Sequence, residues 1–385
     1  MNYYNVFEDM AKDETFNFLT SRIKNTTQSG TFLQEKYQDV NSWRQKYREK
    51  IKDLLFCQQE KVPFNEEITE SEDFGTYLRH KVYFDSAPGC RIPAYLLIPK
   101  GLTKKAPGVV VMHDHGAMAY WGKEKAVKHK MPIPVLDEFI DTLYDTPLAS
   151  NLAERGYVAL VIDSILFGER AFKVDQKAEF KERLAKHELG SPAYVDEYNN
   201  CAFEMQSDIA RTFFLAGTTL MGHRFWDDLV SLDFLASRPE VDSEKLGCIG
   251  LSMGAYRSGF LGIMDDRIKC AVIAGGMQRY REMMQYRLPQ VEWMWTVPGL
   301  YGIMDFDNVM SLRAPLPLLA IHGKKDWLFE PESTGEKAIA HVAAVYEKAG
   351  ASGNFQYEYF DEPHVFKAYM QNKAFSWMDR HLKGE

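Results

Sequence analysis

Cysteine is scarce in this chain, and its spacing shows no pairing pattern. The sequence has five cysteines, an odd number, and no C-x-x-C motif that would indicate a metal or redox site. Cys248 and Cys270 lie in apolar runs that look like buried strands. We therefore interpret the cysteines as small core thiols of a protein that works in a reducing compartment.

The sequence also lacks the segments that would take it to a membrane. No apolar run approaches the roughly 20 residues that a transmembrane helix needs. The N-terminus, MNYYNVFEDMAKDETF, has neither the basic region nor the apolar region of a signal peptide. These absences predict a cytoplasmic protein with no membrane partner.

Clusters of positive charge are missing as well. The chain carries 46 Lys and Arg against 54 Asp and Glu, a net charge of −8, and no basic run reverses this balance locally. Because a mildly acidic surface repels phosphate backbones, nucleic acid is not an expected partner. Composition leaves the oligomeric state open, a homodimer included.

The chain is long enough for a large core. It has 385 residues, of which 45% are hydrophobic and 26% charged, an ordinary balance for a globular protein. Residues 1–75 are charged, aromatic and helix-leaning, which predicts a helical N-terminal extension. From Thr76 on, the runs TYLRHKVYFD and RIPAYLLIPK flank the turn-forming cluster SAPG and predict a β-hairpin.

Residues 76–385 form the predicted main domain, in which apolar runs alternate with segments long enough for helices. The runs are GVVVMHD, YVALVIDS, KLGCIGLS, KCAVIAGG, LPLLAIHG and FQYEYFDE. Near-continuous apolar strands bounded by helices are typical of a parallel sheet covered on both faces. One crossover helix is expected between about Phe203 and Arg238. With the hairpin in front, the sequence predicts an α/β fold with a mostly parallel central sheet.

Two segments interrupt this alternation. Residues 117–145 form a long polar insertion that contains the run Lys123-Glu124-Lys125, and residues 277–308 are rich in aromatic residues and methionine. Each directly follows a predicted strand, and ligands of open α/β sheets bind beyond the carboxyl ends of the strands. We therefore predict that both insertions cap a site. Its candidate substrate contacts are Trp121, Trp293, Trp295 and Tyr301, although aromatic residues of a lid also form its own small core.

The pentapeptide Gly250-Leu251-Ser252-Met253-Gly254 stands where a strand gives way to a helix. KLGCI supplies the strand, and MGAYRSGFLGIM supplies the helix. A nucleophile elbow needs this context, because its strained turn leaves no room for side chains at the positions that flank the serine. We predict that Ser252 is a catalytic nucleophile.

A serine hydroxyl needs a base, and a histidine base needs an acid that fixes its tautomer. Downstream, LPLLAIHG leads to Asp326, and FQYEYFDE leads to His364. Both side chains follow the carboxyl ends of later strands, where they can converge on Ser252. We predict Asp326 as the acid and His364 as the base. Weaker candidates are Glu330, Asp361 and Glu362 for the acid, and His322, His341 and His381 for the base.

The tetrahedral intermediate of acyl transfer needs hydrogen-bond donors for its oxyanion. The backbone N–H of Met253, the residue after the nucleophile, is the first predicted donor. The second should come from the loop His113-Asp114-His115-Gly116, which follows the strand GVVVM. His115 and Gly116 are both candidates, and the sequence does not choose between them.

At these residues the chain resembles the α/β-hydrolase superfamily, in particular its dienelactone-hydrolase-like and acetyl xylan esterase-like branch. GLSMG around Ser252, HGKKD ending in Asp326 and EPH ending in His364 match the nucleophile, acid and base of that family. HDHG stands at its oxyanion loop, and DSILFGER is a further similar stretch. The resemblance covers roughly residues 76–385. It implies hydrolysis of carboxylic esters, acetylated sugars among them, without a metal or an organic cofactor.

Three other interpretations stay open. His113-x-His115 at a strand end could bind zinc together with His223, His322 and Asp326, although this leaves GLSMG unexplained. A serine peptidase of the prolyl-oligopeptidase type would share the triad, but residues 1–75 cannot build the propeller that such enzymes usually carry. A non-catalytic, ligand-binding relative would share only the fold. Our first expectation is an esterase whose partner is a small-molecule or oligosaccharide ester with a short acyl group.

Overall fold

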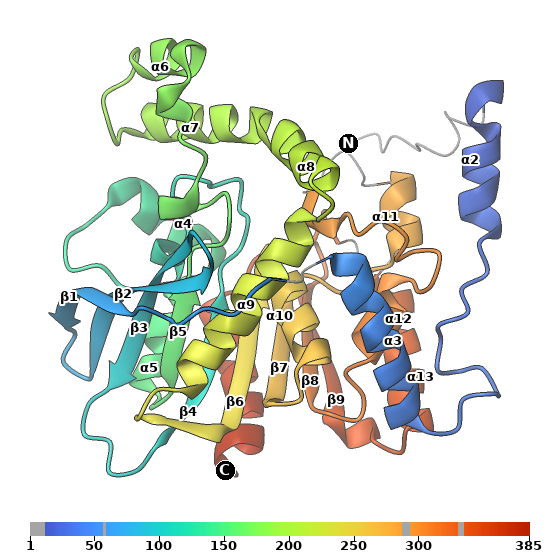
Figure 1. Ribbon diagram of the computed structural model, residues 1–385. Coiled ribbons are helices and arrows are strands. Elements are labelled where there is room, and N and C mark those ends of the chain that lie inside the picture. The colour runs from blue at the N-terminus through green and yellow to red at the C-terminus, as the bar shows by residue number, and fades with distance from the viewer. Residues whose placement is uncertain (1–11, 57–58, 287–292, 330–334) are drawn as a thin grey trace.

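A nine-stranded mixed sheet forms the centre of the protein (Figure 1). The computed structural model describes residues 12–56, 59–286, 293–329 and 335–385. The strands lie in the spatial order β1-β2-β3-β5-β4-β6-β7-β8-β9. Their bounds are β1 Glu67–Asp73, β2 Tyr77–Ala87, β3 Cys90–Pro99, β4 Ala106–Met112, β5 Val158–Ile162, β6 Val241–Leu251, β7 Ile268–Ala274, β8 Leu318–Gly323 and β9 Phe355–Phe360.

The pairing of the strands confirms the predicted sheet. β2 and β3 form the expected antiparallel hairpin, and β3 pairs antiparallel with β5. From β5 through β4, β6, β7 and β8 to β9, neighbouring strands pair in parallel. β4 is buried along its whole length, with Val110 and Met112 in the core of one face and Val109 and Val111 in the core of the other. The apolar runs are therefore continuous because both faces of the sheet are covered.

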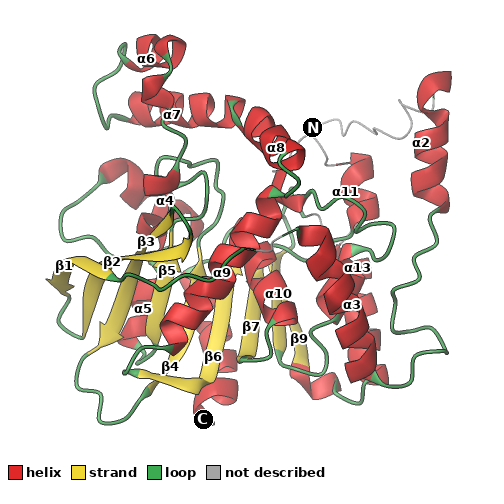
Figure 2. Cartoon of the chain, in the orientation of Figure 1, coloured by secondary structure: helices red, strands yellow, loops and turns green. Residues whose placement is uncertain are grey.

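Helices cover both faces of the sheet (Figure 2). α3, α9, α10, α12 and α13 pack on one face, and α4, α5 and α14 pack on the other. The helix bounds are α2 Glu14–Asn25, α3 Val40–Leu55, α4 Pro134–Leu143, α5 Leu148–Glu154, α6 Ala178–Leu184, α7 Pro192–Glu204, α8 Gln206–Leu215, α9 Leu220–Ala236, α10 Met253–Met264, α11 Tyr280–Tyr286, α12 Phe306–Ser311, α13 Glu336–Lys348 and α14 Ala368–Met378.

The N-terminal extension contains the expected helices. α3 docks on the main body through Arg44, whose guanidinium donates to the carbonyl of Leu312 at 2.8 Å and pairs with Asp266 at 2.7 Å. Trp43 is buried beside it, and its indole N–H donates to the carbonyl of Gly30 at 2.8 Å. The extension is thus packed against the main domain along α3.

The predicted boundary of the extension at residue 75 is wrong for its last residues. Glu67–Asp73 form the edge strand β1, which pairs with β2. Its sequence, EITESED, is acidic and largely exposed, so no hydrophobic alternation marks it as a strand. Instead, its glutamates pair with basic residues across the strand, in the ion pairs Glu72–Arg79 and Glu70–Lys81.

The first predicted insertion differs from its sequence pattern. Residues 117–145 contain the short 3₁₀ helix η1 (Lys123–Ala126) and α4. Lys123 and Lys125 are 0% and 1% exposed, so the apparently polar run lies in the interior. In the second insertion, α11, the 3₁₀ helix η5 (Trp293–Trp295) and α12 are described, whereas residues 287–292 lie outside the described chain.

A third segment over the carboxyl ends of the strands was not predicted as a cap. α6, α7 and α8 follow β5 and stand above the sheet in Figure 1. The expected crossover helix over 203–238 is in fact several helices, of which α9 is the one that packs on the sheet. Helical spacing alone does not distinguish a buried helix from a protruding one such as α8, where Leu215 is 91% exposed. None of the described helices combines the length and the hydrophobicity that a bilayer crossing requires.

Candidate active site

Ser252 occupies a strained turn between β6 and α10. Its backbone has φ 58° and ψ −116°, a left-handed conformation that costs a non-glycine residue free energy. A Cβ at Gly250 would lie 2.5 Å from the carbonyl carbon of Gly254, and a Cβ at Gly254 would lie 2.0 Å from the carbonyl oxygen of Met112. Positions 250 and 254 must therefore be glycine because the end of β4 approaches the turn closely, which is typical of a nucleophile elbow.

Asp326 and His364 contact each other directly. Asp326 Oδ2 lies 2.6 Å from His364 Nδ1, and Asp326 Oδ1 accepts from the backbone N–H groups of Leu328 and Phe329 at 2.9 and 3.0 Å. The loops that carry the pair are in close contact, because a Cβ at Gly323 would lie 2.2 Å from the carbonyl of Glu362. The end of β8 and the end of β9 thus hold the carboxylate against the imidazole.

The surroundings keep the Asp326 carboxylate ionised. Burial alone would raise the pKa of this group, which is 1% exposed. The charge of His364 and the hydrogen bonds from His364 and the Phe329 N–H outweigh burial and lower the pKa below its usual value. An ionised carboxylate accepts the Nδ1 proton of the imidazole, so the lone pair of Nε2 is the one left to accept a proton.

The imidazole of His364 lies beside the elbow. A Cβ at Gly275 would lie 2.9 Å from its Cε1, and Gly275 directly follows Ala274, whose carbonyl accepts from the N–H of Ser252 at 2.9 Å. His364 Nε2 is buried, and it has no hydrogen-bond partner among the described residues. Ser252 is 8% exposed, and its side chain makes no capping hydrogen bond to the first turn of α10. A serine–histidine hydrogen bond often tightens only when substrate binds.

The predicted oxyanion donors border the same turn. Met253 is the first residue of α10, and its backbone N–H has no acceptor among the described residues, as expected for the first turn of a helix. The loop of His115 and Gly116 follows β4, and a Cβ at Gly254 would lie 3.1 Å from the carbonyl of His113 in that loop. The ring of His115 stacks on Phe203 of α7 with centroids 4.9 Å apart.

Among the four predicted aromatic contacts, Trp295 is linked to His364 through one intervening ring. Its ring centroid is 3.9 Å from that of Tyr256 on α10 and 5.7 Å from that of Phe329, which is itself 5.3 Å from the ring of His364. Trp295 is 7% exposed, so it forms part of the core beneath the second insertion. Phe329 was not singled out from the sequence, although it follows Asp326 by three residues.

The other three predicted aromatic residues have different surroundings. Trp293 donates to Ser207 Oγ of α8 at 3.0 Å and so joins two capping segments. Tyr301 donates its hydroxyl to the carbonyl of Ile23 in α2 at 3.1 Å. Trp121 packs edge-on against Tyr120, with ring centroids 4.8 Å apart. The structure does not bring these three together with the ring of His364.

The weaker candidates for acid and base have other partners. Asp361 pairs with Lys325 at 2.9 Å, Glu362 accepts from Tyr369, and Glu330 lies outside the described residues. His322 is fully buried, where its Nε2 accepts from the N–H of Met277 at 3.3 Å, and burial lowers its pKa to about 4. A neutral, enclosed imidazole of this kind supports the loop after β7.

The zinc interpretation does not fit the arrangement of the side chains. His113 Nδ1 contacts the carbonyl of Asp114 at 2.8 Å, and its Nε2 accepts from the N–H of Ser164 at 3.2 Å. Among the described residues, the group with metal-binding spacing is Glu124, Asp163 and Glu169, which contains no histidine. Lys123 Nζ lies at its centre, 2.7, 2.8 and 2.7 Å from Glu124, Asp163 and Glu169. A lysine ammonium therefore pairs with all three carboxylates.

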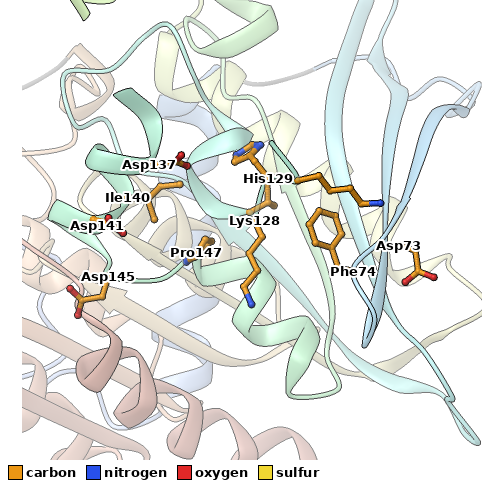
Figure 3. Close-up of a pocket in the computed structure, with 11 residues that line it drawn as sticks. Asp73, Phe74, Lys128, His129, Asp137, Ile140, Asp141, Asp145 and Pro147 are labelled. Atoms are coloured by element: carbon orange, nitrogen blue, oxygen red, sulfur yellow. The ribbon is translucent and has the colours of Figure 1, made fainter. Parts of the chain in front are cut away.

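A separate pocket lies on the flank of the domain (Figure 3). It has a volume of about 470 Å³ and is bounded by the turn after β1 and by α4. It is lined by Asp73, Phe74, Val127, Lys128, His129, Lys130, Asp137, Ile140, Asp141, Asp145 and Pro147. None of the predicted site residues is among them, so this pocket is distinct from the elbow.

The sheet order, in which β4 and β5 are exchanged, and the serine turn between β6 and α10 define an α/β-hydrolase fold. The chain is similar to members of the α/β-hydrolase superfamily. The model of the prolyl oligopeptidase family matches residues 206–385. The Bacillus subtilis (strain 168) protein named "Putative hydrolase YtaP" is 26% identical over 293 residues, which cover 76% of this chain and 84% of that protein.

Solved structures with the same fold include carbohydrate esterases by name. A "putative acetyl xylan esterase" from Bacteroides fragilis NCTC 9343 has a TM-score of 0.70 and 17% identity, covering 90% of this chain and 82% of that one. A glucuronoyl esterase from Solibacter usitatus has a TM-score of 0.59 and 15% identity, covering 92% of this chain and 97% of that one. At these identities the likeness establishes the fold.

Proposed function

We propose that this protein is a serine hydrolase that cleaves carboxylic esters through an acyl-enzyme. The observation that carries the proposal is the state of His364. Its Nδ1 is held by Asp326 at 2.6 Å, while its buried Nε2 has no partner among the described residues and its ring lies beside the strained turn of Ser252. This is the arrangement that a general base needs before it receives a serine proton.

The proposed steps use the chain's own groups. Ser252 Oγ attacks the ester carbonyl while His364 Nε2 takes its proton, and Asp326 stabilises the imidazolium. The N–H of Met253 and an N–H of the 114–116 loop hold the oxyanion. His364 then returns the proton to the leaving alcohol. Water, activated by the same imidazole, releases the acyl group as a carboxylic acid.

Short acyl esters of carbohydrates are the proposed substrate class. The similarity to structures named acetyl xylan esterase and glucuronoyl esterase supports this choice. The aromatic ring of Phe329 beside His364 also supports it, because such rings line the pockets of small ligands. Deacetylation of an oligosaccharide would then be the natural form of the reaction.

Covalent labelling tests the nucleophile. A fluorophosphonate probe should label the wild-type protein and Ser252→Ala should lose the label, whereas Ser376→Ala, a helix serine whose hydroxyl bonds to the carbonyl of Asn372, should keep it. Turnover of p-nitrophenyl acetate should follow the label. Equal labelling of the Ser252→Ala protein would remove the assignment, and an unlabelled wild-type protein would favour a non-catalytic ligand-binding relative.

A serine peptidase is the second candidate, because the prolyl oligopeptidase family matches residues 206–385. The chemistry would use the same three side chains, so only the substrate separates the two functions. Acetylated xylo-oligosaccharides and a peptide p-nitroanilide should be assayed side by side. Turnover of the anilide alone would overturn the esterase proposal.

A further inference from the structure

Lys125 is a buried cation whose partners are mainly backbone carbonyls. It is 1% exposed, and its Nζ donates to the carbonyl oxygens of Asp114 at 2.7 Å, His115 at 3.2 Å and Met118 at 3.4 Å. The Oδ2 atom of Asp114 lies 3.5 Å away. An ammonium has three N–H donors and no acceptor, so this one side chain gathers the carbonyls of a single turn.

That turn has a shape that local preference does not supply. Gly116 and Ala117 have φ values of 54° and 52°, so two successive residues are left-handed and one of them carries a Cβ. A Cβ at Gly116 would lie 2.2 Å from Asp114 Oδ2. Tyr144 at the end of α4 holds the other oxygen of Asp114 at 2.5 Å. Side chains of the 117–145 insertion therefore determine the path of the turn.

The carbonyls held by Lys125 determine where the amides of the turn point. In a trans peptide the C=O and N–H bonds are antiparallel. The carbonyls of Asp114 and His115 face Lys125, so the N–H groups of His115 and Gly116 face away from it. The N–H of Gly116, like that of Met253, has no acceptor in the part of the chain that the structure describes.

We propose that Lys125 is a positioning residue, which holds the carbonyls of Asp114 and His115 so that the amide of Gly116 completes the oxyanion hole with that of Met253. This inference rests on the proposed function, because an oxyanion hole has a use only if Ser252 attacks a carbonyl. Lys125 does not touch the substrate itself. It acts from behind the turn, through fixed backbone dipoles.

The test compares Lys125→Met, which keeps most of the apolar stem and loses the donors, with Lys125→Gln, which keeps two N–H donors. Lys128→Met is the matched control, since Lys128 is a surface lysine of the same insertion that pairs with Glu154 of α5. Each full-length protein is titrated with a fluorophosphonate to count active sites. The kcat and KM for p-nitrophenyl acetate and the inhibition constant of an aryl trifluoromethyl ketone, which binds as an oxyanion, are then measured per active site.

Lys125→Met should lower kcat about 10²–10³-fold with little change in KM, since the loss of one oxyanion donor has an effect of that size. The trifluoromethyl ketone should bind more weakly by a comparable factor. Lys125→Gln should lie between Lys125→Met and the wild type, and Lys128→Met should match the wild type in all three quantities. If Lys125→Met does not fold, the parallel change of kcat and ketone affinity in Lys125→Gln carries the test.

Wild-type kcat per active site in the folded Lys125 variants would overturn the inference. So would a loss of kcat that leaves the affinity for the ketone unchanged, because a merely structural lysine would act in that way. A wild-type protein that the fluorophosphonate does not label would instead refute the proposed function, before any Lys125 variant is compared.

Discussion

Replacement of Asp326 by asparagine has a predictable effect because the structure decides which way the amide would face. In the wild-type protein, Asp326 Oδ1 accepts from the N–H groups of Leu328 and Phe329 at 2.9 and 3.0 Å, and Oδ2 faces His364 Nδ1 at 2.6 Å. An asparagine must keep its carbonyl oxygen on the two backbone donors. Its NH₂ group therefore faces His364 Nδ1 and donates to it.

A donor at that place reverses the tautomer of His364. Nδ1 must then be unprotonated, and the proton moves to Nε2, which can no longer accept a proton from Ser252. For a triad, the loss of the correct tautomer lowers kcat about 10⁴-fold, which equals about 5.4 kcal/mol of activation free energy at about 1.36 kcal/mol per factor of ten. The fold should persist, because the two backbone hydrogen bonds are kept.

The assay is the kcat of Asp326→Asn for p-nitrophenyl acetate, with the rate of fluorophosphonate labelling as a second measure of the nucleophile. Asp361→Asn is the control, since Asp361 lies in the neighbouring loop after β9 but pairs with Lys325. A kcat of Asp326→Asn within about tenfold of the wild-type value would refute the assignment of Asp326 as the acid.

The same variant gives a stability measurement with a defined sign. The pKa of Asp326 is lowered from 3.8 in the folded protein, so its carboxylate stabilises the fold above about pH 3.8, and this contribution is lost as the pH falls through the lower folded pKa. Asp326→Asn lacks this dependence. Urea denaturation from pH 7 to pH 3 should show that the wild-type protein exceeds Asp326→Asn in free energy of unfolding, and that this difference shrinks only at the acid end. A difference that grows on acidification would contradict the sign.

Three further predictions test how the rest of the domain supports the site. Gly275→Ala should lower kcat about 10²-fold, because φ is 56° and the added Cβ would lie 2.9 Å from His364 Cε1; unchanged turnover would show that the ring is not confined there. Arg257→Met should lower the free energy of unfolding by about 3–5 kcal/mol, since it leaves the carboxylate of Asp228 buried without its partner, and a second change of Asp228 to asparagine should restore part of the loss in urea denaturation. Asp266→Asn should lower the free energy of unfolding by only about 1 kcal/mol, because the side chain of Asp266 is 56% exposed although it pairs with two arginines of α3. The wild-type protein should lose the same stabilisation as the pH falls from 3.8 through the lowered pKa of about 2, and thermal melts over this pH range would detect the loss.

Much of the fold and part of the site could be predicted from the sequence because they depend on local patterns. The apolar runs of β4 to β8 are buried on both faces, so their composition already indicates a covered parallel sheet. Glycines are needed at positions 250 and 254 because neighbouring backbone atoms leave no room for a Cβ there, and this requirement is visible as residue type. The positions of Asp326 and His364 after two later strands follow from the same topology.

Other features were decided only by tertiary contacts. β1 is recognisable as a strand only through its pairing with β2. The sequence does not show that α6 to α8 protrude from the domain, because exposed and buried helices share the same spacing of apolar residues. The run Lys123-Glu124-Lys125 has the composition of a solvated loop. It is buried because the carboxylate of Asp163, 40 residues away in sequence, accepts from Lys123 and because the carbonyls of the turn after β4 accept from Lys125.

The difference has one physical cause. Hydrophobic periodicity and glycine positions reflect how each residue affects its own backbone and its immediate neighbours, so the residue types alone predict them. The burial of a charge depends instead on partners that only the folded chain brings within hydrogen-bond distance, because an unpaired ammonium could not leave water. The sequence therefore determined the sheet and the serine turn, whereas the tertiary structure alone decided that Lys125 lies behind that turn.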